Sequence, residues 1–280
     1  MTAEVTNIAW RATSMVDTFC RQVLRSTADS EELTGPGQPR CSVDRNTGNG
    51  VLVMKRWPVT SVLAIQTSPS RSFPRVWTPV RAGLWDIRHP LISLGDSASA
   101  TAPDGGWTID VAPGYVNWRC GRGGQRVQVC YVNGWPHTSL TAACTGDAGT
   151  LDVDDVTGWA GASGFAYDGA STEQMSVLSV SATTPVELPN GAGIVEAGPG
   201  TVTLATPLTF DHAEGTVISA LPANVVEATI LAATIQALEG GIDAITIQAM
   251  PGEHSSSTGG GAEDLTGQYQ KLLGDYRRVA

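Results

Sequence analysis

The chain has few charged residues, few histidines and no long hydrophobic run. Only 16% of its 280 residues are charged, and it has four His. No run of about 18 apolar residues occurs, so the sequence predicts no membrane-spanning helix. Its first residues lack the basic and apolar regions of a signal peptide. Hydrophobic residues make up 41%, which indicates a folded chain.

Cysteine is also scarce, and its spacing excludes two common uses. The five cysteines, Cys20, Cys41, Cys120, Cys130 and Cys144, form no CxxC pair. An odd number at irregular spacing argues against a disulfide framework and against a structural zinc site. We expect reduced, mostly buried thiols, made in a cytosol.

Recognisable catalytic patterns are missing as well. The sequence contains neither HExxH nor G-x-S-x-G, and the glycine-rich stretch at 121–124 is not followed by Lys-Ser/Thr. Acidic residues cluster at two places in the sequence: Asp211 and Glu214 lie around His212, and Asp152, Asp154 and Asp155 lie close together. Each cluster is consistent either with a turn or with a bound metal ion. Both depart from known metal motifs, so we expect no enzyme and no catalytic, cofactor-binding or metal-binding residue.

The charge balance restricts the partners of the chain. With 17 Lys and Arg against 27 Asp and Glu, the net charge is −10, which is unsuited to binding nucleic acid by neutralising phosphates. Eight of the basic residues lie between positions 40 and 88, either on a solvated surface with local ion pairs or on a face toward an acidic subunit or DNA. The net charge favours the protein partner. These residues are Arg40, Arg45, Lys55, Arg56, Arg71, Arg75, Arg81 and Arg88.

Three segments have helical periodicity. Residues 5–25 place apolar side chains on one stripe, and residues 265–279 form a shorter amphipathic pattern with a basic end. Between them, Pro222 starts a helix over 223–239 that is nearly free of charge. A helix of that kind is buried on most sides, in a core or against another subunit.

Two groups of β-type segments occupy the rest of the chain. Residues 51–65, 85–87, 107–111 and 126–132 predict a small, mostly antiparallel sheet, with a loop at 95–106 and a further strand at 242–250. Short strands at 150–153, 165–167, 173–180, 201–204 and 216–220 predict a β-barrel or sandwich. We therefore expect an α+β fold: a host domain, residues 1–136 and 222–280, of helices and a small sheet, with an all-β domain inserted at 137–221. The two ends of that insert should lie close together.

Several short motifs occur in a characteristic order. The amphipathic first helix is followed by MKRWPVTSV at 54–62, YVNGWP at 131–136, the alanine-rich helix after Pro222, and LLGDYRR at 272–278. This order resembles the head–tail connector (adaptor) proteins of tailed double-stranded-DNA bacteriophages, over about residues 5–136 and 222–279. The extra Trp57 and the Val132-Asn133 pair depart slightly from the usual pattern, and the insert departs from the minimal family.

The resemblance implies a non-enzymatic virion protein. Connectors form homo-oligomeric rings, typically of about twelve subunits, beneath the portal protein. DNA passes through the centre without sequence-specific binding, and a stopper or tail terminator protein binds below. The protein would be made in the bacterial cytoplasm and would reside in the virion neck, with no membrane partner. The family's C-terminal segment commonly contacts the portal, which here implies Tyr269, Leu272, Leu273, Tyr276, Arg277 and Arg278.

A closed ring needs a heterologous interface between subunits. We expect the apolar helix over 223–239 to supply it, through Val225, Thr229, Ala232, Ala233 and Gln236.

Two other functions remain open. The β-insert would be a capsid- or receptor-binding module, or the chain would be another neck or tail protein such as a tail terminator. Binding to the portal would support the connector. Binding to glycans or to the capsid lattice would support the binding module, and binding to tail-tube ends would support the tail terminator.

Overall fold

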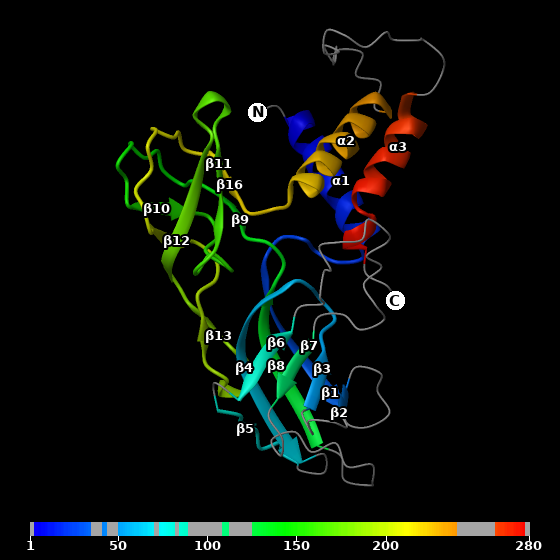
Figure 1. Cartoon of the computed structure of the whole chain (residues 1–280), viewed down its shortest axis with the longest axis vertical. Helices are drawn as coiled ribbons and strands as arrows, with labels where there is room; N and C mark the ends of the chain where they lie inside the picture. Colours follow the sequence, from blue (N-terminus) through cyan, green and yellow to red (C-terminus); the bar gives the residue numbers. More distant parts are fainter. Residues whose placement is uncertain are drawn as a thin grey trace. The chain divides into compact units, whose positions relative to one another are not determined.

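The protein has an α+β fold (Figure 1). The computed structural model describes residues 3–34, 41–43, 50–69, 73–81, 84–88, 108–111, 125–239 and 261–277. These residues form two compact units, Met1–Leu24 with Pro222–Ala280, and Arg25–Leu221. The first unit contains the helices and the second contains the strands. The predicted loop at 95–106 and strand at 242–250 lie outside the described residues.

The helical unit is a bundle of α1 (Ala3–Cys20), α2 (Ala223–Glu239) and α3 (Gly261–Leu272). Helix α2 packs against both of the others. The core takes one face from each helix, because apolar residues three or four apart share a face. Its buried residues are Ala12, Val16, Cys20, Val225, Ala228, Ala232, Ile235, Tyr269 and Leu273.

Two predicted helix ends are wrong. Helix α1 ends at Cys20 and not at residue 25, because Arg21 adopts a left-handed conformation (φ 56°) and the chain beyond it is not helical. The last helix stops at Leu272, and a separate 3₁₀ turn, η3 (Gly274–Tyr276), follows it. Helix α2 has the predicted bounds, with the Pro222 carbonyl accepting bonds from Val225 and Val226.

The first sheet of the β unit has the order β1-β8-β4-β5, all antiparallel: β1 (Thr27–Thr34), β8 (Gln125–Asn133), β4 (Val59–Pro69) and β5 (Thr78–Pro79). A second sheet has the order β2-β3-β7-β6: β2 (Cys41–Val43), β3 (Gly50–Val53), β7 (Thr108–Val111) and β6 (Trp85–Arg88). One core cluster contains Leu33, Ile65 and Val129 of the first sheet with Leu52 of the second. The small antiparallel sheet predicted from the sequence is therefore two sheets.

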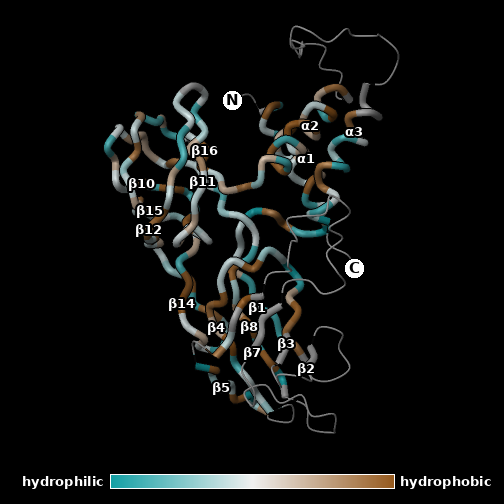
Figure 2. Tube along the Cα trace, viewed as in Figure 1, coloured by the Kyte–Doolittle hydropathy of each residue, from teal (hydrophilic) through white to brown (hydrophobic). Residues whose placement is uncertain are grey.

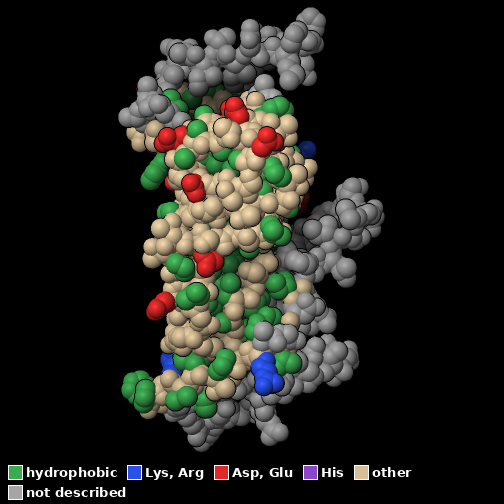
Figure 3. Space-filling model, turned by 90° about the vertical axis from the view of Figure 1, so that its left-hand side faces the viewer, with side chains coloured by type: hydrophobic (Ala, Val, Ile, Leu, Met, Phe, Trp, Pro, Cys, Tyr) green, Lys and Arg blue, Asp and Glu red, His purple; other side chains and the backbone are tan. Residues whose placement is uncertain are grey.

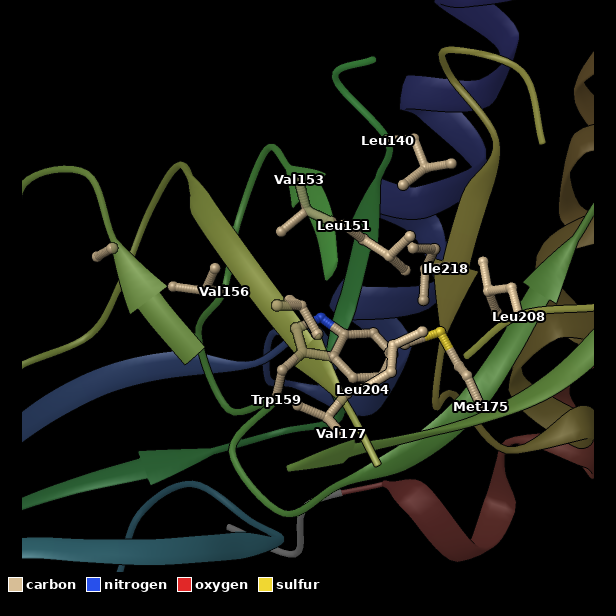
Figure 4. Close-up of a cluster of buried hydrophobic side chains, with 12 residues drawn as sticks. Leu140, Leu151, Val153, Val156, Trp159, Met175, Val177, Leu204, Leu208 and Ile218 are labelled. Atoms are coloured by element: carbon tan, nitrogen blue, oxygen red, sulfur yellow. The ribbon is translucent and has the colours of Figure 1, made fainter. Parts of the chain in front are cut away.

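The third sheet lies entirely within residues 137–219 and curls into a half-barrel. Its order is β10 (Thr150–Val153), β15 (Gly200–Leu204), β12 (Glu173–Ala182), β11 (Ser163–Tyr167), β16 (Val217–Ser219) and β9 (His137–Ser139). A single bridge between Leu140 and Val153 connects its two edges. Its core surrounds the fully buried Trp159, whose ring lies among Met175, Val177 and Leu204 (Figure 4).

The two ends of this segment lie side by side, as expected. His137 pairs with Ser219, and the Ala220 N–H donates to the Pro136 carbonyl at 2.8 Å. The predicted domain boundaries themselves stay a prediction, because the compact unit joins the half-barrel to the two other sheets.

A short hairpin connects the half-barrel segment to the first sheet. Strands β13 (Val186–Glu187) and β14 (Ile194–Val195) pair with each other, and the turn η2 (Pro189–Gly191) lies between them. Leu188 and Val195 pack against Ala64, Cys130 and Val132. Hydrophobic residues follow β4, β8 and β14 in Figure 2. One face of the first sheet is therefore covered by residues of the insert.

Candidate functional site

The two motifs that carry the family resemblance meet in the first sheet. Strand β4 begins within the motif at 54–62, and β8 ends within the motif at 131–136. The two strands are antiparallel neighbours, so Val59 pairs with Asn133. The Gly134 N–H donates to the Pro58 carbonyl at 2.9 Å, and its φ of 83° suits a residue without a Cβ. Segments about 75 residues apart therefore form one structural feature.

Strand β1 completes this feature from the other side of β8. Asp29 pairs with Tyr131 and Thr27 with Asn133. The Asp29 carboxylate accepts hydrogen bonds from the Asn133 amide at 2.6 Å and from the Arg56 guanidinium at 3.0 Å. The buried Asn133 side chain is thus held by the Asp29 carboxylate, and the negative charge strengthens the hydrogen bond between them.

A second carboxylate, Glu31, lies in the same network. It is 9% exposed and accepts hydrogen bonds from the Lys55 backbone N–H at 2.8 Å and from the Tyr131 hydroxyl. Burial, together with the nearby Glu31 charge, raises the pKa of Tyr131 well above its usual range. Tyr131 therefore stays protonated and donates. A buried and fully bonded network of this kind fixes a local structure.

The predicted C-terminal contact residues divide into buried and accessible ones. Tyr269 is 6% exposed and packs edge-on against Phe19, with ring centroids 5.8 Å apart, and Leu273 is fully buried. Leu272 and Tyr276 are half-buried and Arg277 is exposed. Arg278 lies outside the described residues.

The segment after α3 is tied to the first helix. The Arg277 guanidinium lies over the Phe19 ring, 5.3 Å from its centroid, within the range of a cation–π contact. The Gln22 side chain donates to the Tyr276 carbonyl at 3.3 Å. The C-terminal turn therefore packs on its own bundle.

The predicted interface residues of α2 also divide. Val225 and Ala232 are buried in the bundle core, while Thr229, Ala233 and Gln236 are half-buried. The Gln236 amide contacts the Met15 sulfur at 3.2 Å. The apolar residues that α2 leaves exposed are others, Ile230 at 61% and Leu238 at 45%.

The acidic groups noted in the sequence are part of local hydrogen-bond networks. Asp155 accepts bonds from the Thr157 N–H and hydroxyl, from Gly198 N–H and, through its other oxygen, from Arg25 at 2.6 Å. Burial alone would raise the pKa of Asp155, but these bonds outweigh it and lower the pKa. Asp152 accepts from Thr201 and Asp154 from Ser139.

His212 lies in the half-barrel, and its side chain is buried. Its ring faces Asp168 at 3.3 Å and Glu173 at 2.9 Å. Its sequence neighbour Asp211 accepts a hydrogen bond from the Gly146 N–H at 2.6 Å. Within the described residues, no group of His, Cys, Asp and Glu side chains is placed to hold a metal ion.

Two of the basic residues between 40 and 88 make ion pairs. Arg56 pairs with Asp29, and Arg75 with Glu32 at 2.6 Å. Arg126 also contacts Glu32. Arg40, Arg45 and Arg71 lie outside the described residues.

Cys20 and Cys130 are buried free thiols, and Cys144 is half-buried. Burial, with Asp17 nearby, raises the pKa of Cys20 to about 12, so this thiol is unreactive at neutral pH.

The network around Asp29 and Glu31 was missed at the level of sequence. Residues 27–34, TADSEELT, have low β-propensity, and their polar residues hid the strand. The period-two spacing of Thr27, Asp29, Glu31 and Leu33 is the signal that could have revealed it.

Comparison of the chain with protein-family models, with curated proteins and with solved structures finds no match. Among the described helices, none is long and apolar enough to cross a membrane.

Proposed function

We propose that the protein is a non-enzymatic structural protein of a bacteriophage particle, a head–tail connector. It forms a ring of about twelve copies between the portal and the next neck or tail protein, a stopper or tail terminator. The DNA channel runs through the centre of the ring. The protein is made in the bacterial cytoplasm and ends in the virion neck.

One observation carries this proposal. The segments that give the resemblance are neighbours in space within each unit, although they are far apart in the sequence. Strands β4 and β8 join the motifs at 54–62 and 131–136, and α1, α2 and α3 join the remaining three in one bundle. Motifs that form contiguous structures are better support for a family than motifs that share only their order.

The charge of the protein fits a channel through which DNA moves. The net charge of −10 disfavours tight binding to phosphates. Acidic side chains are scattered over the face shown in Figure 3. A lumen with this character would let packaged DNA slide.

The exposed residues of the bundle supply candidate contacts. On α2, Ile230 and Leu238 lie eight residues apart, with Thr234 between them, and so form one outward stripe. Trp10 of α1 is 75% exposed. We assign the ring interface to this outward stripe, since Val225 and Ala232 already serve the bundle core. Leu272, Tyr276 and Arg277 are the accessible residues for the portal.

Native mass spectrometry of the purified protein, alone and mixed with a candidate portal protein, tests the proposal. A stoichiometric complex of a ring on the portal is the expected result. Binding to tail-tube ends in place of the portal would assign the protein to another part of the tail. Binding to neither would overturn the connector function.

A further inference from the structure

The outer surface of the half-barrel carries an exposed group of aromatic and neutral polar side chains. Along β11, Ser163, Phe165 and Tyr167 are exposed while Gly164 and Ala166 are buried. The exposed residues therefore share one face, as alternate strand residues do. Neighbouring strands extend it with Gln174 and Ser176 of β12 and Val217 of β16.

The two rings are neighbours on one strand. Phe165 is 43% and Tyr167 is 40% exposed, and their ring centroids lie 6.0 Å apart with an interplanar angle of 44°. The strand beneath them has little freedom: a Cβ on Gly164 would come within 2.7 Å of the Ser219 carbonyl and 2.9 Å of the Trp159 ring. The backbone that carries the two rings is therefore closely packed, which reduces the cost of ordering it when a ligand binds.

The outward-facing residues of this surface on β11, β12 and β16 are uncharged; Glu173, the charged residue of β12, pairs with the buried Ala166 and so lies on the opposite face. Phe165 pairs with Gln174 on one side and with Ser219 on the other, and Ser219 bonds to His137 at 3.0 Å. Burial, together with Arg25, lowers the pKa of His137, so that ring is neutral near pH 7. Two acidic residues lie at the border of the face. Asp154 accepts a hydrogen bond from Ser139, and Asp168 follows Tyr167 in the sequence. A face of this kind does not attract phosphates.

The apolar area is also small. Phe165, Tyr167, Val217 and the nearby Leu178 of β12 are its exposed apolar side chains. A stable protein–protein interface uses about 20–30 residues on each side. A few rings bordered by hydroxyl and amide groups suit a small neutral ligand better than a protein.

We propose that this face binds a neutral saccharide. A pyranose ring presents a flat row of C–H groups, which packs on aromatic rings such as Phe165 and Tyr167. Its hydroxyl groups both donate and accept, and so match Gln174, the paired hydroxyls of Ser163 and Ser176, and the bordering carboxylates. This activity is additional to the connector function and does not depend on it.

Isothermal titration of the full-length protein with chitotetraose, cellohexaose and maltohexaose tests the proposal. At least one of these neutral oligosaccharides should bind with a Kd of about 1 mM or tighter. The double variant Phe165→Ala/Tyr167→Ala should weaken that binding roughly tenfold or more. Ile194→Ala, which removes a more exposed apolar residue, 63% exposed, from β14, should leave that binding unchanged.

Three results would overturn the inference. The first is that none of the three oligosaccharides binds. The second is that binding persists in the double variant while its circular dichroism matches the wild type. The third is that heparin or duplex DNA binds this face more tightly than the neutral sugars, which would assign it to an anionic ligand. The portal experiment is independent of all three.

Discussion

At the scale of single residues, the molecule depends on a few buried polar groups that bind distant strands together. Asp29 and Glu31 of β1 accept from Arg56, Lys55, Tyr131 and Asn133, all of which lie in or beside the two motifs. These four motif residues therefore stabilise the fold of the first sheet.

Tyr131→Phe tests this explanation. The variant removes one donor from the buried Glu31 carboxylate and should lower the free energy of unfolding by about 1–3 kcal/mol. Urea denaturation measures the loss. Tyr167→Phe, at an exposed tyrosine, is the matched control and should change stability by about 0.5 kcal/mol or less. Equal losses in the two variants would show that the Tyr131–Glu31 bond is not specifically stabilising.

Asp155→Asn tests the other hydrogen-bonded carboxylate. The folded-state pKa of Asp155 is lowered, so its contribution is present above the unfolded pKa of about 3.9 and is lost as the pH falls through the folded pKa. The variant should be less stable than wild type by about 1–3 kcal/mol at pH 7. That difference should shrink below about pH 4. Unfolding curves at several pH values measure it.

Asp154→Asn is the control for this experiment, because the Asp154 side chain is exposed and accepts a hydrogen bond from the Ser139 hydroxyl. It should cost about 0.5 kcal/mol or less at pH 7. A difference between Asp155→Asn and wild type that does not depend on pH would contradict the assigned role of its charge.

At the scale of elements, helix α2 shows how one segment can serve two purposes. Its inner face, with Val225, Ala228, Ala232 and Ile235, completes the bundle core. Its outer face remains apolar at Ile230 and Leu238. A helix that is apolar on both faces suits a protein that both folds and assembles.

Ile230→Asp should abolish or weaken the ring without unfolding the bundle, because the side chain is 61% exposed. Native mass spectrometry measures the assembly and circular dichroism the helix content. Ile235→Asp, at a position 2% exposed, should unfold the bundle by burying a charge. A ring of unchanged mass in Ile230→Asp would remove this stripe from the interface.

The C-terminal helix permits a similar comparison of adjacent residues. Leu272 is half-buried and Leu273 is fully buried. Leu272→Asp should weaken binding to the portal while the bundle stays folded, whereas Leu273→Asp should destabilise the bundle by about 3 kcal/mol or more. Pull-down on immobilised portal and thermal melting separate the two effects. Unchanged portal binding by Leu272→Asp would exclude this end of the helix from the contact.

At the scale of the whole molecule, residues 137–221 are joined to the rest of the β unit by more than their two ends. Leu188 and Val195 cover Ala64, Cys130 and Val132, and Asn190 donates to Gln128 at 2.7 Å. The segment therefore protects one face of the first sheet as well as forming its own half-barrel.

Deletion of residues 137–220, with a short Gly-Ser linker, tests the two-domain prediction. The remaining chain should fold, because the ends of the segment adjoin and the cluster around Leu33, Ile65 and Val129 receives nothing from it. Exposure of Val132 should reduce solubility, and adding Val132→Thr should restore it. Near-ultraviolet circular dichroism and cooperative melting measure folding. Failure of both deletion variants to fold would show that the segment is part of one domain.

The sequence by itself determined the α+β class, the bounds of α2 and most strands of the half-barrel. Each of these depends on a local signal: Pro222 at a helix start, or alternation as in residues 150–153. Only the tertiary structure decided that 27–34 is a strand, which face of α2 is exposed, and which residues join the two motifs. Those features depend on partners about 30 to 220 residues away, and local periodicity carries no information about such partners.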